Sequence, residues 1–428
     1  MRVAGPVRGE VTAPPSKSLT QRALIAAALA RGRSRISNPL LSDDSRHLIA
    51  ALGAVGIPAR VLEAAPRREA VVEVDGRGGE IPAESAQLRV GNAGTTMRFL
   101  TALLALGRGS YLIDGDRRMR ERPIGALLEA LRSLGAAAES VHRDGCPPVR
   151  VGGRGIPGGR ARLSGSTSSQ FLSGLLLAAP ASATGVSVEI AGEVVSRPYV
   201  DLTIGMMRRF GVEVACRPPG PAARRFGVEA GQRYLARELR IEGDYSSASY
   251  FFAAAAVTGG SVTVRDLDPG SGQGDARFLD LLREMGCRVH RGRDRVTLEA
   301  GAALRGIDAD LGAMPDVAPT LAVVALFADG ATRIRGVPHL RLKETDRIGA
   351  VVGEIRRLGG EARPERDGLL IEPRPLSPAR IETYGDHRMA MAFAIAGLRI
   401  PGVSIADPGC VAKSFPAFWS VLDDLTRA

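Results

Sequence analysis

A segment that recurs along almost the whole chain of 428 residues most constrains its fold. Small polar or acidic residues precede an apolar stretch of about ten residues, a length typical of a buried helix, and a glycine-containing turn follows. Successive starts lie 70 to 78 residues apart. The copies begin at Ser16, Asn92, Ser166, Asp244, Asp316 and Asp386.

A second kind of segment follows each copy except, it is expected, the last. It is an amphipathic helix that ends in glycine, as at 127–135, 206–211, 281–286 and 355–359. Glycine suits the left-handed position just past a helix end. Alternating residues then predict paired strands, for example at 288–290 and 295–298.

The repeating unit is therefore strand, helix, strand, helix and two paired strands. It is longer than the 20–50 residues typical of solenoid repeats. We expect an α/β protein with two similar domains of three units each.

The domain boundary is expected near residue 239, after the last strand of the third unit. The Pro- and Gly-rich segment 217–221 is interpreted as a hairpin loop inside that unit. The pattern alone leaves the strand near 7–12 open to either domain, and we assign it to the second. The expected domains are 14–239, and 1–13 together with 240–428.

Composition restricts the classes of partner. Lys and Arg number 57 against 46 Asp and Glu, a net charge of +11, which favours nucleic acid or small phosphorylated acids. Aromatic residues are only 4%, which leaves few stacking platforms for nucleic acid. The chain has no apolar run of about 18 residues, no secretory-type segment and four scattered cysteines. We expect a cytoplasmic monomer without nucleic-acid or membrane partners.

Lysine is rare in this arginine-rich chain. Only Lys17, Lys343 and Lys413 occur, so 54 of the 57 basic residues are arginine. A compact ammonium with a tunable charge cannot be replaced by a planar guanidinium at every site. The alternative is that the three are chance survivors on the surface.

The six helix starts are candidate anion sites. The unsatisfied N–H groups and the helix dipole favour negative ligands there, although any single start is more often an ordinary N-cap. If the units pack alike, three starts in each domain line one face. Two facing domains would then close over anionic ligands.

The segment Lys343-Glu344-Thr345-Asp346-Arg347 carries the densest charge. Lys343 and Arg347 would share a face if the segment were helical, with Glu344 pointing elsewhere. The pattern by itself favours an ordinary salt-bridged helix start. The alternative is that Glu344 acts as an acid or a base among cations.

These motifs together resemble the EPSP synthase family of enolpyruvyl transferases. They occur in the family's order and span nearly the whole chain, and all three lysines lie in them. The resembling motifs are Pro15-Ser16-Lys17-Ser18, Gly91-Asn92-Ala93-Gly94-Thr95, Arg120-Glu121-Arg122-Pro123-Ile124-Gly125, Ser168-Ser169-Gln170-Phe171, Lys343-Glu344-Thr345-Asp346-Arg347, Asp386-His387-Arg388-Met389-Ala390 and Lys413-Ser414-Phe415-Pro416.

The resemblance implies an inside-out α/β barrel-like fold of six βαβαββ units, with the active site in the cleft between the domains. It implies transfer of the enolpyruvyl group of phosphoenolpyruvate to the 5-hydroxyl of shikimate 3-phosphate, without a cofactor or a metal. Phosphate is released. The first domain would bind shikimate 3-phosphate, and the second would supply the phosphoenolpyruvate side and the catalytic carboxylates.

The resemblance also implies roles for individual residues. Asp316 corresponds to the base, Glu344 to the acid, and Lys17 lies where both substrates meet. The shikimate 3-phosphate contacts would be Lys17, Ser18, Arg22, Ser168, Ser169, Gln170, Ser196, Asp316 and Lys343. The phosphoenolpyruvate contacts would be Lys17, Gly94, Arg122, Gln170, Arg347, Arg388 and Lys413.

Two positions depart from the family pattern, and two rival functions stay open. Phe99 stands where many members have proline, and His339 where many have asparagine. The nearest rival is the sister enzyme that uses UDP-N-acetylglucosamine, which typically has a cysteine near 117–122; no cysteine of this chain lies there. The other rival is a basic protein that binds nucleic acid or processes RNA ends.

Overall fold

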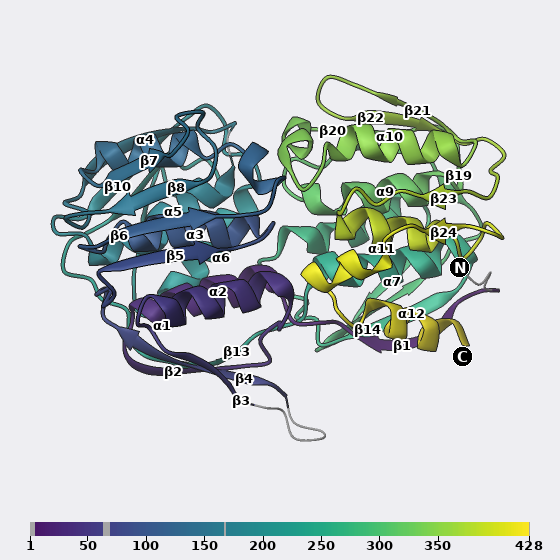
Figure 1. Ribbon diagram of the computed structural model, residues 1–428. Coiled ribbons are helices and arrows are strands. Elements are labelled where there is room, and N and C mark those ends of the chain that lie inside the picture. The colour runs from purple at the N-terminus through teal and green to yellow at the C-terminus, as the bar shows by residue number, and fades with distance from the viewer. Residues whose placement is uncertain (1–4, 63–68, 167, 428) are drawn as a thin grey trace. The chain divides into compact units, whose positions relative to one another are not determined.

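The computed structural model describes residues 5–62, 69–166 and 168–427, and it divides the chain into two compact units (Figure 1). Unit 1 consists of Met1–Pro14 and Glu242–Ala428, and unit 2 of Pro15–Ile241. The boundaries differ by one and two residues from those expected from the sequence. No helix of the described residues is long and apolar enough to cross a membrane.

Helices that are buried on nearly all sides form the centre of each unit. In α7, for example, every residue from Tyr245 to Thr258 is buried. A helix without a polar face is stable only when other elements surround it, and alanine and serine let neighbouring helices approach closely. In unit 2 these helices are α1 (Lys17–Leu29), α3 (Gly94–Leu104) and α5 (Ser169–Ala178); in unit 1 they are α7 (Tyr245–Thr258), α9 (Ala318–Ala325) and α11 (His387–Ala396).

Helices with one polar face cover the outside. The predicted glycine ends are confirmed, because Gly135, Gly211, Gly286 and Gly359 all have φ between +82° and +109°. Each follows the end of its helix, α4, α6, α8 or α10, after one intervening residue. The helices of this kind are α2 (Asp43–Ala54), α4 (Gly125–Ser133), α6 (Arg197–Arg209), α8 (Phe278–Glu284), α10 (Arg347–Arg357) and α12 (Phe418–Arg427).

Mixed sheets complete unit 2, and the described residues of each sheet show one parallel pair followed by two antiparallel pairs. This is the strand, helix, strand, helix, paired-strand unit expected from the repeat. The strand orders are β13 (Glu238–Arg240), β2 (Arg31–Ser37), β4 (Val71–Arg77), β3 (Ala59–Leu62); β5 (Ser85–Arg89), β6 (Ser110–Asp114), β8 (Val149–Gly152), β7 (Ala137–Ser140); and β9 (Gly159–Ser164), β10 (Val186–Ala191), β12 (Arg225–Val228), β11 (Ala215–Arg217).

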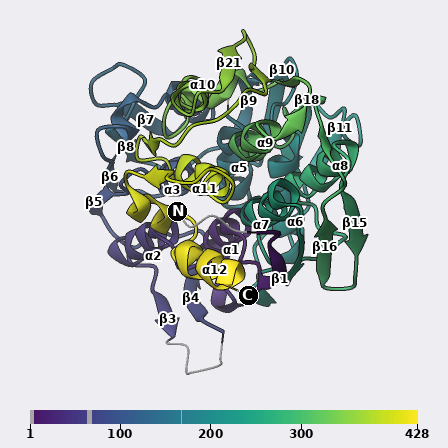
Figure 2. The same ribbon diagram turned by 90° about the vertical axis from the view of Figure 1, so that its right-hand side faces the viewer.

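Unit 1 repeats the pattern, and the β15–β16 hairpin predicted from the alternation is visible in Figure 2. The second segment was expected to be missing after the last copy, but its helix is present there as α12, and that part of the prediction is wrong. The described strands of this copy are the parallel pair β23–β24. The strand orders are β1 (Arg8–Thr12), β14 (Ser261–Arg265), β16 (Arg295–Glu299), β15 (Arg288–Arg291); β18 (Asp308–Asp310), β20 (Thr332–Arg335), β22 (Leu369–Glu372), β21 (Glu361–Pro364); β17 (Leu304–Arg305) with β19 (Ala328–Asp329); and β23 (Arg380–Ile381) with β24 (Ser404–Ile405).

The chain passes from one unit to the other at two places. At each place, the last strand before the crossing pairs with a sheet of the unit that the chain is leaving. Strand β1 pairs with β14 in unit 1 before the chain enters α1. Strand β13 pairs with β2 in unit 2 before the chain enters α7. The starts of α1 and α7 are thus anchored by a neighbouring strand. The segment 217–221 joins the antiparallel strands β11 and β12, which confirms the hairpin prediction.

Short 3-10 helices carry several of the charged residues discussed below. All except η2, which follows the end of α5, lie before the starts of longer helices. They are η1 (Met119–Glu121), η2 (Ala179–Ala181), η3 (Gly274–Arg277), η4 (Pro315–Val317), η5 (Pro338–Leu342) and η6 (Pro408–Lys413).

Candidate active site

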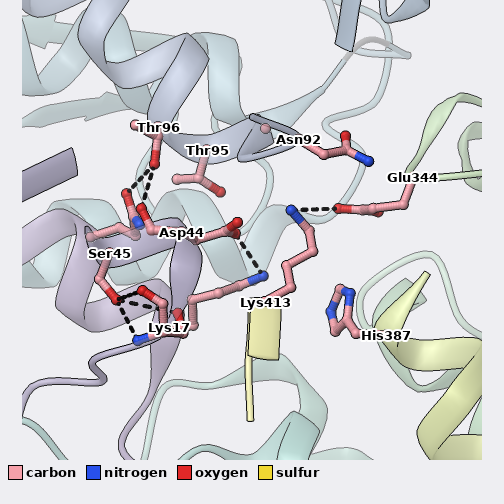
Figure 3. A network of polar contacts seen from close by, with 12 residues as sticks. Lys17, Asp44, Ser45, Asn92, Thr95, Thr96, Glu344, His387 and Lys413 are labelled. Atoms are coloured by element: carbon pink, nitrogen blue, oxygen red, sulfur yellow. Dashed lines mark hydrogen bonds and ion pairs between the residues drawn. The ribbon is translucent and has the colours of Figure 1, made fainter. Parts of the chain in front are cut away.

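Side-chain hydrogen bonds tie the helix starts of unit 2 together. Gln170 at the start of α5 donates from Nε2 to Thr95 Oγ1 on α3, at 3.1 Å. Thr96 Oγ1 lies 3.1 Å from Gln21 Oε1 on α1 and 3.0 Å from the backbone oxygen of Asp44 on α2 (Figure 3). The expectation that three helix starts meet within one domain is confirmed for this unit.

Lys17 is the first residue of α1, and its ammonium is held by a carboxylate. Its Nζ lies 3.2 Å from Asp44 Oδ2, and the Asp44 side chain is only 3% exposed (Figure 3). Sequence analysis missed Asp44. The available signal was the pair Asp43-Asp44 directly after the N-cap Ser42, since only one of two neighbouring residues can point inward.

Arg22 is buried beneath the start of α1, and it bonds to the protein through its whole guanidinium. Nε donates to Thr203 Oγ1 at 2.8 Å, while Nη1 and Nη2 donate to the backbone oxygens of Ser18 and Tyr199, each at 2.9 Å. Burial lowers the pKa of Arg22 to about 10. The side chain therefore keeps its charge at neutral pH and links α1 to α6.

Gly94 begins α3, and the side chain of Arg122 occupies the space beside it. A Cβ at Gly94 would lie 2.6 Å from Arg122 Nη2, closer than side chains tolerate. Arg122 Nη1 also donates to Asn92 Oδ1 at 3.0 Å. The resemblance places both Gly94 and Arg122 among the phosphoenolpyruvate contacts, and the structure brings the two residues together.

The remaining predicted residues of unit 2 lie at the starts of α5 and α6. Ser168 is the N-cap of α5 and accepts a hydrogen bond from the Gln170 N–H at 3.3 Å, and Ser169 is the first residue of that helix. Ser196 precedes α6 with a left-handed φ of 52° and is buried. A left-handed residue other than glycine costs free energy, so the fold holds Ser196 in a defined orientation.

Arg347 lies at the centre of a charged cluster in unit 1. The side chain is buried, with Nε 2.7 Å from Asp386 Oδ2, Nη1 3.2 Å from Asp316 Oδ1 and Nη2 2.7 Å from Glu344 Oε2. Burial lowers the pKa of Arg347, but the three carboxylates outweigh that effect and raise it above its usual value. Asp386 was quoted only as part of a motif, and its contact with Arg347 could not be read from the sequence.

Asp316 on η4 is the point where three cations meet. Arg388 Nη2 lies 2.6 Å from Asp316 Oδ2, Arg347 lies 3.2 Å from Oδ1, and Lys343 Nζ lies 4.0 Å from Oδ1. Arg388 Nη1 also donates to the Tyr250 hydroxyl at 3.5 Å. These contacts join the starts of α9 and α11, and Tyr250 adds the second turn of α7. The expected meeting of helix starts is therefore seen in unit 1 for α9 and α11.

Glu344 is held between two cations. Besides Arg347, it contacts Lys413 at the end of η6, with Nζ 3.9 Å from Oε1 (Figure 3). Both the Glu344 and the Lys413 side chains are 9% exposed. A carboxylate and an ammonium with this little access to water interact strongly with any charge placed beside them.

The interpretation of 343–347 as a salt-bridged helix start is wrong. Lys343 is extended, and α10 begins only at Arg347, with Asp346 as N-cap accepting from the Gly349 N–H at 3.1 Å. Glu344 does not point away from the cations but binds Arg347. A carboxylate that is distant in the sequence explains why no helix forms at 343–346. Asp316 contacts both Lys343 and Arg347, so these two residues come together without a helix between them.

His339 on η5 belongs to the surroundings of Asp316, although sequence analysis assigned it no role. Burial, reinforced by Lys343, lowers the pKa of His339 to about 4, against the opposing effect of Asp316. The imidazole is therefore neutral at neutral pH. Among the described residues, no group of three or more His, Cys, Asp or Glu side chains could hold a metal ion.

Comparison with known proteins identifies the family. The family model "EPSP synthase (3-phosphoshikimate 1-carboxyvinyltransferase)" matches residues 1–422. The chain belongs to the EPSP synthase family. A 3-phosphoshikimate 1-carboxyvinyltransferase of Trichormus variabilis is 46% identical over 415 residues, covering 97% of this chain and 96% of the relative. One of Methanoculleus marisnigri is 46% identical over 419 residues, covering 98% and 97%.

Solved structures agree with the family assignment and with the expected two-domain α/β fold. An EPSP synthase of Acinetobacter baumannii superposes with a TM-score of 0.80 at 27% identity, covering 100% of this chain and 97% of that one. The ring of Phe99 lies beneath the Arg22 guanidinium, 5.4 Å from ring centre to Cζ, so Phe99 supports a buried cation.

Proposed function

We propose that this chain transfers the enolpyruvyl group of phosphoenolpyruvate to the 5-hydroxyl of shikimate 3-phosphate and releases phosphate. The proposal rests on the family membership and on relatives with that enzyme name that align over nearly the whole chain. One observation carries the chemistry: a buried arginine, Arg347, joins the two carboxylates Asp316 and Glu344. An acid and a base are thereby held around one cation.

The substrates are doubly acidic, and the proposed contacts are mostly cations and hydroxyls. In the proposal, Lys17 contacts both substrates, and Gln170 also lies near both. Arginine forks suit planar carboxylates and phosphates. Shikimate 3-phosphate is bound by Ser18, Arg22, Ser168, Ser169, Ser196, Asp316 and Lys343, and phosphoenolpyruvate by Gly94, Arg122, Arg347, Arg388 and Lys413.

The first step is an addition. Asp316 accepts the proton of the 5-hydroxyl while the hydroxyl oxygen bonds to C2 of phosphoenolpyruvate. Glu344 gives a proton to C3, so the double bond becomes a single bond and a tetrahedral intermediate forms. Lys17 stabilises the charge that develops, as preorganised cations do in buried sites.

The second step is an elimination. The bond from C2 to the phosphate oxygen breaks, phosphate leaves, and Glu344 takes back a proton from C3 as the double bond re-forms. Cations beside the phosphate stabilise the leaving group, and Arg347, Arg388 and Lys413 have that charge. Asp316 gives the proton that it took from the 5-hydroxyl to the leaving phosphate, so the acid and the base exchange roles in this step and both return to their starting states.

Glu344 must carry a proton before the first step, although Arg347 and Lys413 hold it as an anion. The phosphate and carboxylate of phosphoenolpyruvate compete for those same cations. A carboxylate that loses its cationic partners and gains anionic neighbours binds a proton more readily. Substrate binding therefore prepares Glu344 as the acid.

A coupled phosphate-release assay with shikimate 3-phosphate and phosphoenolpyruvate tests the proposal, with UDP-N-acetylglucosamine as the control acceptor. With phosphoenolpyruvate present, we expect phosphate release with shikimate 3-phosphate as the acceptor and none with UDP-N-acetylglucosamine. Asp316→Ala should lower kcat by about 10²–10⁴-fold while shikimate 3-phosphate still binds. Turnover only with the UDP-sugar, or none with either acceptor, would overturn the proposal. The cytoplasmic location and the monomeric state stay predictions.

A further inference from the structure

Glu354 is a buried carboxylate in unit 1 that the proposed mechanism does not use. It lies on α10, seven residues after Arg347, so both side chains lie on the same face of that helix. The Glu354 side chain is 0% exposed. A charge that is removed from water in this way is costly unless hydrogen-bond donors satisfy it.

The segment that precedes α11 supplies two of the donors to Glu354. The N–H of Glu382 donates to Oε2 at 3.0 Å, and the hydroxyl of Tyr384 donates to Oε1 at 2.7 Å. A further donor, Arg357 Nε, belongs to α10 itself and lies 3.1 Å from Oε2, with its side chain half exposed. Both oxygens of the carboxylate therefore hold the segment between β23 and α11.

This segment contains a strained turn. The Asp386 N–H donates to the backbone oxygen of Thr383 at 2.8 Å, which closes the turn. The two central residues, Tyr384 and Gly385, have positive φ of 56° and 66°. Glycine adopts this conformation freely, but a bulky residue such as tyrosine adopts it only where the surrounding structure compensates the cost. The bonds to Glu354 provide such compensation.

The turn ends at a residue of the charged cluster. Asp386 accepts from the Arg388 N–H at 2.9 Å as the N-cap of α11, and from Arg347 Nε at 2.7 Å. Arg347 and Arg388 both contact Asp316. The position of Asp386 therefore determines where these two guanidiniums lie.

We propose that Glu354 is a positioning residue: through the turn it holds Asp386, and with it the two arginines that contact phosphoenolpyruvate. Those arginines are Arg347 and Arg388. Helix α10 contacts the segment before α11 at two points, through Arg347 at its start and through Glu354 two turns later. Without Glu354 one of these contacts is lost, and the strain in the turn favours another conformation. The inference rests on the proposed function, in which both arginines bind phosphoenolpyruvate.

The test measures kcat and the KM for each substrate in wild type, Glu354→Gln and Tyr384→Phe. The amide of Glu354→Gln has one acceptor oxygen where the carboxylate has two, and Tyr384→Phe removes a single bond. We expect the KM for phosphoenolpyruvate to rise about tenfold in Glu354→Gln and about threefold in Tyr384→Phe, since each variant loses part of a bond to a charged group. The KM for shikimate 3-phosphate should stay within about twofold. A loss of folded protein alone would lower the apparent kcat and leave both KM values unchanged.

Arg357→Gln is the matched control. It removes the partner of the same carboxylate that lies on α10, whereas the bonds from Glu382 and Tyr384 to Glu354 remain. It should leave the KM for phosphoenolpyruvate within about twofold of wild type. A rise as large as that in Glu354→Gln would show that the charge balance on α10, and not the hold on the turn, matters.

Hydrogen exchange gives a second measurement that does not depend on turnover. The amides of Asp386 and Arg388 are hydrogen-bonded within the turn and at the helix start. Mass spectrometry of peptides that cover 382–390 should show faster exchange in Glu354→Gln and Tyr384→Phe, with no change in α7 of the same unit. Equal increases in both regions would indicate a general loss of stability and would contradict the proposal.

The outcomes separate this inference from the proposed function. Absence of phosphate release by wild type would mean that the proposed function is wrong, and the exchange at 382–390 would still decide whether Glu354 holds the turn. An active wild type whose KM for phosphoenolpyruvate is the same in both variants would overturn the role of Glu354 alone. Should Glu354→Gln fail to fold, an unchanged KM in Tyr384→Phe, at an exposed side chain, would overturn it equally.

Discussion

The guanidinium of Arg22 lies over the ring of Phe99, 5.4 Å from the ring centre, in the core of unit 2. The contact joins a residue of α1 to one of α3. It also gives the ring of Phe99 a physical role at this position. A buried cation that has lost water gains from the negative face of an aromatic ring.

Phe99→Leu should therefore loosen Arg22 while leaving a side chain that fills most of the space. We expect a loss of about 1–2 kcal/mol in unfolding free energy and a several-fold higher KM for shikimate 3-phosphate with little change in kcat. Urea unfolding and steady-state kinetics measure both. Phe327→Leu is the matched control, since Arg399 lies 5.5 Å above that ring in unit 1; it should lower stability without affecting KM. An unchanged KM in Phe99→Leu would remove Arg22 from the proposed shikimate 3-phosphate contacts.

Gly94→Ala should move the guanidinium of Arg122. The new Cβ would lie 2.6 Å from Arg122 Nη2, so the arginine must shift. We expect the KM for phosphoenolpyruvate to rise about tenfold, equivalent to about 1.4 kcal/mol, while the KM for shikimate 3-phosphate stays constant. Gly205→Ala on α6, whose added Cβ would meet no atom within 4 Å, should leave both unchanged. Equal KM values in Gly94→Ala and wild type would contradict the assignment of Arg122 to phosphoenolpyruvate.

Asp44→Asn should weaken the hold on Lys17. The 3.2 Å ion pair with a buried carboxylate directs the ammonium, and a neutral amide would lose the charge-assisted part of that contact. We expect kcat to fall by about 10- to 100-fold, in line with the loss of a hydrogen bond to a charged group. Asp43→Asn, at the exposed neighbouring position, tests whether any loss of charge at the start of α2 has this effect. A kcat for Asp44→Asn close to that of wild type would show that Lys17 needs no such partner.

His339 should make stability depend on pH in a defined direction. Its folded pKa of about 4 lies below its ordinary value of 6.5, so between these values the unfolded state binds more protons. The contribution of His339 to the free energy of unfolding is fully present above about pH 6.5 and is lost as the pH falls toward 4. Thermal unfolding measured against pH should show that His339→Asn loses less stability at acid pH than wild type does. His142→Asn, at an exposed site, should lose as much as wild type. Parallel curves for wild type and His339→Asn would mean that His339 protonates as easily in the folded state as in the unfolded one.

Local patterns in the sequence determined the repeating architecture. Apolar stretches such as 245–258 are too short to span a membrane and too apolar for a surface, so they predict buried helices, which the structure contains. Glycines such as Gly286 end the outer helices because only a residue without a side chain adopts the left-handed conformation cheaply. The recurring helix starts and the hairpins follow from residues close together in the chain, and so they could be predicted.

Which charges meet was decided by the tertiary structure alone. Arg347 binds Asp316 and Asp386, residues 31 and 39 positions away, and these contacts replaced the local helix predicted at 343–347. Asp44 beside Lys17 had only a weak sequence signal, because the pair Asp43-Asp44 does not say which of the two carboxylates points inward. A charge–charge energy depends on distance and on exclusion of water, and both are set by how distant segments pack.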